Sequence, residues 1–265
     1  VAVALIILML GMSASFGISS QDERKSTSLE DEIPLLLTHS TITDIGFSAD
    51  SIYTNTTIAA GTYNGCAILE NQSMVCWGDN EYGQLGDGTT TGSAVPIYVN
   101  VAANETPVEV TVGQVTACAL MESGNIYCWG SGYYGKMGNG EPWNDDYVNT
   151  EMRQVLLPEG QGGQTVSISG GHICTILNNG DVYCWGRGNQ GQLGYGGTSN
   201  RNIPAKVNLP GQRSAIAIST GTFMTCAITN DGMGYCWGEN DEGQLGNGTT
   251  NSRQMTPAEV LFPSG

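Results

Sequence analysis

The chain has 265 residues and a formal net charge of −16, because 25 acidic residues face only nine Lys and Arg. Nucleic-acid binding depends on clusters of basic residues, so this composition argues against a nucleic-acid partner. The 38 glycines and many short apolar runs, with almost no helical periodicity, predict an all-β protein with many turns.

The N-terminal segment, residues 1–18, contains the uncharged apolar run VAVALIILMLGMSASF, which becomes small and polar near Ser13. This pattern resembles the hydrophobic and cleavage regions of a secretory signal, although the basic residues that usually precede them are missing. A membrane anchor is the alternative, and the run is shorter than the ~20 apolar residues of a typical span. Residues 19–41 are polar and charged and are expected to form a flexible linker.

Residues 42–265 contain a segment that is present in four copies. CAILENQSMVCWGDNEYGQLG begins at residue 66, and related segments begin at residues 118, 174 and 226. A period of about 50 residues is typical of solenoids and propellers. We expect repeats at about 56–107, 108–163, 164–213 and 214–262.

Each repeat is predicted to contain a β-hairpin. In three repeats a three-residue turn ends in glycine, as in Glu122-Ser123-Gly124. Such a turn commonly places its last residue in the left-handed region, where glycine is least strained. Counting back from this turn sets Cys118 opposite Cys128, in the closer of the two kinds of antiparallel pair. The first repeat has Gln72 in place of the glycine.

All eight cysteines lie in these hairpins, two in each. Four cross-strand disulfides are the favoured interpretation, and reduced buried cysteines or zinc ligands are the alternatives. Disulfides indicate an oxidising compartment, so together with the N-terminal run they predict a secreted or cell-surface protein. The predicted pairs are Cys66–Cys76, Cys118–Cys128, Cys174–Cys184 and Cys226–Cys236.

The strand NIYCWG has apolar or aromatic residues on both alternating faces, which indicates a sheet that is covered on both sides. Further strands are predicted before each hairpin, as in VEVTVG, and after it, as in VPIYVN. Four antiparallel strands per repeat and four repeats predict propeller-type blades in a partial propeller or open arc. Trp77, Trp129, Trp185 and Trp237 are interpreted as packing anchors between the blades.

The pattern CALxxxGxxYCWGxxxxGQLGxG resembles the regulator of chromosome condensation repeat over roughly residues 56–262. The second repeat departs from it with Gly135-Lys136-Met137-Gly138. A histidine that the family often carries before the second strand is present only as His172 and is replaced by Asn64, Thr116 and Met224. The family usually closes with seven blades, so four imply a fragment, a ring completed by partner chains, or an open arc.

The favoured function is a non-catalytic binding scaffold that presents loops to a protein or glycan, with no cofactor or metal. The longest loop, in the second repeat, supplies Trp143, Asp145, Asp146 and Tyr147 as candidate contacts. A calcium site at Asp145 and Asp146 is a less favoured alternative, because the oxygen-ligand spacing of an EF-hand is absent.

Two alternatives are an extracellular glycan-active enzyme that uses carboxylates across blades and an inhibitor of an extracellular enzyme. The resemblance adds nucleotide exchange on a small GTPase, as in nuclear members, and β-lactamase inhibition, as in some exported bacterial members. No Gly-x-Ser-x-Gly elbow or phosphate loop is present in the sequence.

Alkylation of the unfolded, unreduced protein is expected to label no cysteine, because every thiol is assigned to a disulfide. Mass spectrometry before and after reduction measures this directly. Free thiols in the mature protein, or disulfides that join different repeats, would contradict the assignment.

Overall fold

A computed structural model describes residues 57–142, 147–250 and 253–263, which belong to one compact unit, residues 53–265. The predicted signal or anchor, residues 1–18, and the predicted linker, residues 19–41, lie outside the described residues. Within the described ranges, no helix has the length and apolar composition needed to cross a membrane.

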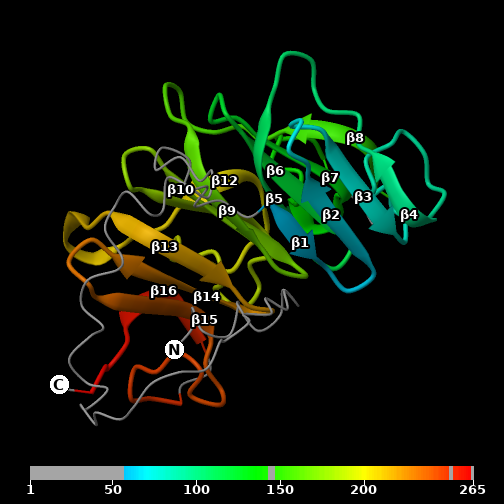
Figure 1. The fold of residues 1–265 in the computed structure, drawn as a ribbon. Coiled ribbons are helices and arrows are strands. Elements are labelled where there is room, and N and C mark those ends of the chain that lie inside the picture. The colour runs from blue at the N-terminus through cyan, green and yellow to red at the C-terminus, as the bar shows by residue number, and fades with distance from the viewer. Residues whose placement is uncertain (1–56, 143–146, 251–252, 264–265) are drawn as a thin grey trace, which may run out of the picture. The chain divides into compact units, whose positions relative to one another are not determined.

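The described residues form four sheets, each with four antiparallel strands in chain order (Figure 1). The first contains β1 (Ile58–Ala60), β2 (Asn64–Ile68), β3 (Met74–Gly78) and β4 (Ser93–Tyr98). The second contains β5 (Pro107–Val112), β6 (Thr116–Met121), β7 (Ile126–Ser131) and β8 (Val148–Gln154). The third contains β9 (Gly163–Ile168), β10 (His172–Leu177), β11 (Val182–Gly186) and β12 (Arg201–Lys206), and the fourth contains β13 (Ala215–Thr220), β14 (Met224–Thr229), β15 (Gly234–Glu239) and β16 (Arg253–Glu259). The predicted fold class, all-β with four propeller-type blades, is confirmed.

The last strand of each sheet begins earlier than the apolar runs suggest. The run at 95–100 predicts a strand there, whereas β4 ends at Tyr98, and the N–H of Val99 still donates to the carbonyl of Met74 at 3.0 Å. Val99 is 7% exposed, and its equivalents Val155 and Val207 are also buried. The apolar signal at these positions therefore comes from packing just beyond the strand, which is why the predicted boundaries are shifted.

The cysteines of each repeat lie directly opposite one another on the two central strands. Their Cα atoms are 4.0–4.1 Å apart, as in the closer kind of antiparallel pair. The structure contains the disulfides Cys66–Cys76, Cys118–Cys128, Cys174–Cys184 and Cys226–Cys236, and no cysteine is free among the described residues. Each disulfide therefore fastens the central hairpin of one blade.

The hairpin turns show why glycine is favoured at their last position. Gly124 has φ +84°, and its N–H donates to the carbonyl of Met121 at 2.9 Å. Gln72 adopts the same conformation, with φ +66° and a bond from its N–H to the carbonyl of Leu69 at 2.8 Å. The first repeat therefore forms the same turn with a side chain that disfavours it.

Consecutive sheets are joined by a hydrogen bond from a buried indole. Trp129 Nε1 donates to the carbonyl of Gln84 at 2.9 Å, in the turn that follows the third strand of the preceding sheet. Trp185 makes the same bond to Lys136 at 2.8 Å, and Trp237 makes it to Gln192 at 2.9 Å. All three rings are fully buried, and Trp77, in the first sheet, is only partly buried. The Gly-Gln-Leu-Gly turn of one repeat is thus the docking surface for the tryptophan of the next.

His172 lies between the third and fourth sheets and is fully buried. The hydroxyl of Thr225 donates to the carbonyl of Gln192 at 2.9 Å, so His172 Nε2, 2.7 Å from that hydroxyl, is the donor to it. His172 Nδ1 then accepts from the hydroxyl of Ser169 at 3.1 Å. Burial lowers the pKa of His172 to about 3, so this ring is neutral and joins two blades.

Replacing Gln72 with glycine is expected to raise the free energy of unfolding by about 1 kcal/mol, because glycine relieves the left-handed strain at this exposed turn. The reverse change, Gly232→Gln, is the matched control, since a Cβ at Gly232 meets nothing within 4 Å. The Gly232→Gln variant should have a free energy of unfolding lower than that of the parent by a similar amount. Urea denaturation measures both, and a Gln72→Gly protein less stable than the parent would contradict this account.

Candidate functional site

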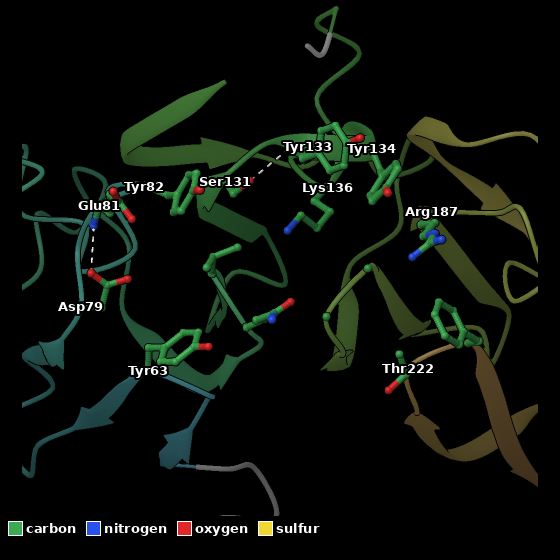
Figure 2. Close-up of a pocket in the computed structure, with 15 residues that line it drawn as sticks. Tyr63, Asp79, Glu81, Tyr82, Ser131, Tyr133, Tyr134, Lys136, Arg187 and Thr222 are labelled. Carbon is green, nitrogen blue, oxygen red and sulfur yellow. Dashed lines mark hydrogen bonds between the residues drawn. The ribbon is translucent and has the colours of Figure 1, made fainter. Parts of the chain in front are cut away.

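The candidate site is a pocket of about 1000 Å³ at one end of the sheets (Figure 2). In a sheet whose strands run in chain order, the first and third connections lie at the same end. The pocket lies where these connections converge from all four repeats. Its lining residues are Tyr63, Asp79, Glu81, Tyr82, Gln114, Val115, Ser131, Tyr133, Tyr134, Lys136, Gly170, Gly171, Arg187, Thr222 and Phe223.

The pocket lining combines aromatic rings with charges of both signs. The rings are those of Tyr63, Tyr82, Tyr133, Tyr134 and Phe223, and the charged residues are Asp79, Glu81, Lys136 and Arg187. A concave site with aromatic walls and a few converging polar groups is typical of ligand and partner binding. The pocket lining is therefore suited to binding a ligand or a partner protein.

Lys136 is the most unusual group of the pocket. It is 2% exposed, and in the part of the chain that the structure describes its ammonium makes no hydrogen bond or ion pair. Figure 2 shows its nitrogen pointing into the open centre of the pocket. Burial lowers the pKa of Lys136 to about 8, because removal from water disfavours the charged form.

The other repeats explain why this lysine is exceptional. Lys136 occupies the place of Gln84, whose Oε1 accepts from the N–H of Tyr82 at 2.9 Å and whose Nε2 donates to Asp79 at 2.8 Å. An ammonium has no acceptor, so Lys136 cannot form the first of these bonds. The position of Asp79 is taken in the second repeat by Ser131, which carries no charge. The second repeat thus has a cation without the carboxylate that this position provides in the first and fourth repeats, as Asp79 and Glu239.

Arg187 is held on the pocket wall by aromatic contacts. Its guanidinium carbon lies 5.1 Å from the ring centroid of Tyr134 and 4.9 Å from that of Phe223. Its Nε donates to Asn189 Oδ1 at 2.8 Å. These contacts fix a second positive charge at the pocket and connect the second, third and fourth repeats.

The loop residues proposed from the sequence belong to the connection between β7 and β8, which also carries Lys136. Trp143, Asp145 and Asp146 lie outside the described residues. Tyr147 is partly buried against the core, and its hydroxyl donates to Glu141. This hydrogen bond raises the pKa of Tyr147. Tyr147 thus has a local structural contact, and its role in binding stays a prediction.

Sequence reasoning missed the pocket residues, and only one of them carried a visible signal. That signal was the departure from Gly-Gln-Leu-Gly to Gly-Lys-Met-Gly in the second repeat. Most of the other lining residues differ between repeats at equivalent positions, although Tyr82 corresponds to Tyr134, so the repeat pattern does not mark the pocket. Lys136 is identifiable from the sequence as the one position where the glutamine of the Gly-Gln-Leu-Gly turn is replaced by a charged residue.

Glu109 is a second buried ionisable group, and it is not among the pocket-lining residues. Its Oε1 accepts from the Thr165 hydroxyl at 3.0 Å, and its Oε2 has no partner among the described residues. Burial raises the pKa of Glu109 to about 7. In the ranges that the structure covers, no group of three His, Cys, Asp or Glu side chains is placed to hold a metal ion.

The repeats match a known family. The protein-family model described as Regulator of chromosome condensation (RCC1) repeat matches residues 75–120, 179–228 and 231–265 of the sequence. A second model with the same description matches residues 56–84, 108–136, 164–192 and 215–244. The chain belongs to the RCC1 repeat family. The second set of matches includes all four RCC1 hairpins and ends each time at the second residue of the Gly-Gln-Leu-Gly turn or its Gly-Lys-Met-Gly equivalent.

This RCC1 repeat chain is 32% identical over 199 residues to the E3 ubiquitin-protein ligase HERC2 of Homo sapiens, a match that covers 74% of the chain and 4% of HERC2. It is 33% identical over 206 residues to the Ultraviolet-B receptor UVR8 of Arabidopsis thaliana, covering 78% of the chain and 46% of UVR8. The chain thus spans less than half the length of these relatives.

Among solved structures, Prp20p of Saccharomyces cerevisiae has the same fold. The TM-score is 0.67 at 19% identity, and the match covers 77% of this chain and 50% of Prp20p. The four RCC1 sheets therefore correspond to about half of that chain.

Lys136→Gln is expected to raise the free energy of unfolding at pH 7 by about 1–3 kcal/mol, because it removes an unpaired buried charge. Between pH 8 and 10.5 the unfolded chain holds a proton on Lys136 that the folded protein has released. As the pH rises through this window, the free energy of unfolding of the parent protein should therefore increase relative to that of the variant, by up to about 1.4 kcal/mol per pH unit. Urea denaturation of both proteins across the window measures the difference, and a constant difference would contradict the burial of this ammonium.

Proposed function

We propose that this chain is an exported or cell-surface binding scaffold that contacts a protein partner through the pocket end of its repeats. The observation that carries the proposal is the convergence of aromatic and charged side chains from all four repeats on one pocket of about 1000 Å³. Tyrosine and arginine are the residue types most often found at the energetic centre of protein interfaces. The disulfide-fastened hairpins hold these loops on a rigid support, which reduces the entropy lost on binding.

Export is supported by the cysteines and by the N-terminal sequence. All eight cysteines of the chain are paired within hairpins, and such structural disulfides persist mainly in oxidising compartments. The apolar run in residues 1–18 resembles a secretory signal.

A non-catalytic role is supported by the state of the groups that commonly act in catalysis. The cysteines are bonded to one another, and His172 is fully buried between sheets with a pKa of about 3. A general base is effective when its pKa lies near the working pH, so this histidine is a poor one at neutral pH. The buried carboxyl of Glu109 is not among the pocket-lining residues.

The proposal is tested by crosslinking the full chain to its neighbours on the cells that produce it and identifying the captured proteins. The double variant Tyr63→Ala, Phe223→Ala removes two rings from the pocket rim and should reduce capture of the main partner at least tenfold. Glu122→Ala is the matched control, because this exposed residue lies in a hairpin turn at the opposite end. Equal capture by the parent and the double variant, or a loss only with Glu122→Ala, would contradict the proposed surface. Capture of a glycan carrier that is abolished by deglycosylation would replace the protein partner with a glycan.

A further inference from the structure

The ammonium of Lys136 is an incomplete interaction inside the pocket. The Lys136 residue is only 2% exposed, its nitrogen points into the cavity, and among the described residues it has no acceptor (Figure 2). Buried charges in proteins are normally paired, because desolvation without a partner is costly. An anion that enters the pocket would supply the missing partner.

We propose that Lys136 binds the carboxylate of a Glu or Asp side chain that the protein partner inserts into the pocket. This inference rests on the proposed function and specifies the chemistry that the scaffold recognises. Lys136 donates to the incoming carboxylate, while the surrounding rings cover the aliphatic part of the inserted side chain.

The charges of the pocket favour a carboxylate over a phosphate group. The lining already contains the carboxylates of Asp79 and Glu81, and the whole chain carries a net charge of −16. A doubly charged phosphate would meet stronger repulsion than a singly charged carboxylate. Lys136 supplies one unpaired positive charge, and Arg187 adds a second that is already held by Tyr134, Phe223 and Asn189.

The size and walls of the pocket favour a side chain carried on a peptide. A volume of about 1000 Å³ is far larger than a carboxylate alone and accommodates the residues that flank it. The lining comes from loops of all four repeats, so a peptide segment laid across the pocket would touch each of them. Aromatic walls beside a single buried cation suit an acidic residue next to apolar ones.

The chain offers an unusually direct test because it contains only three lysines, Lys25, Lys136 and Lys206. In protein labelled with ¹³C at lysine, three side-chain signals are expected. Lys136→Gln and Lys206→Gln variants assign them. Lys206 is the internal control, because it is exposed and already paired with Asp181 at 2.7 Å.

Two capped probes are compared, acetyl-Phe-Glu-Phe-amide and acetyl-Phe-Gln-Phe-amide, which differ only in the carboxylate. The acidic probe should shift the Lys136 signal and raise the pKa of Lys136 by about one unit or more, while Lys206 stays unchanged. Lys136→Gln should weaken binding of the acidic probe at least tenfold, and Lys206→Gln should leave it unchanged.

Three results would overturn the inference: equal binding of both probes, an unchanged Lys136 signal with the acidic probe, or undiminished affinity in Lys136→Gln. Acetate and glucuronate are tested alongside. Tighter binding of either one than of the acidic peptide would replace the peptide side chain with a free carboxylate or an acidic sugar.

Failure of this inference is distinguishable from failure of the proposed function. Loss of cellular capture with Tyr63→Ala, Phe223→Ala, but not with Lys136→Gln, would keep the binding surface and remove the carboxylate site.

Discussion

The arrangement of the sheets depends on one repeated contact, in which a buried tryptophan of one repeat is held against the Gly-Gln-Leu-Gly turn of the repeat before it. The indole N–H donates to the carbonyl of the second residue of that turn, in three successive pairs. The last glycine of the turn allows the close approach: a Cβ at Gly194 would lie 2.7 Å from Trp237 Nε1. Since the donor is buried, loss of its acceptor would leave an unsatisfied polar group in the core. The contact therefore fixes where each sheet sits relative to the next.

The disulfides stabilise the inside of each blade and not the contacts between blades. Each joins directly opposite residues of the two central strands, so it holds the hairpin register without linking one repeat to another. Between sheets, the order depends on packing and on buried polar contacts such as that of His172 with Thr225. Hairpins held covalently and sheets held by burial together give a stable support for the loops at the pocket end.

The same turn that contacts the tryptophans also supplies the cation of the pocket. The backbone of Lys136 performs the common structural task, because its carbonyl accepts from Trp185. Its side chain is free to differ from the glutamines of the other repeats, and it extends into the cavity instead of bonding to its own loop. A repeat architecture thus allows one copy to gain a recognition group while its structural role is kept. The relatives HERC2 and UVR8 contain the same repeats within longer chains, so the repeat alone does not determine a partner.

The amino-acid sequence by itself determined the features that depend on local spacing. The hairpin turns and the opposed cysteines follow from distances of ten residues or fewer within one hairpin, where the turn sets the register. The four repeats follow from the return of this pattern every 52–56 residues. The predicted boundaries of the last strands lie too late in the chain, because Val99 and Val155, one residue past the strand ends, are apolar for packing in the core. The loop residues Trp143, Asp145 and Asp146 rest on sequence alone. Only the tertiary structure decided that Trp129, Trp185 and Trp237 dock on the preceding turns. It alone also decided that residues as distant as Tyr63 and Phe223 line one pocket around a buried Lys136. These relations depend on how separate sheets stack, and no local pattern in the chain records that geometry.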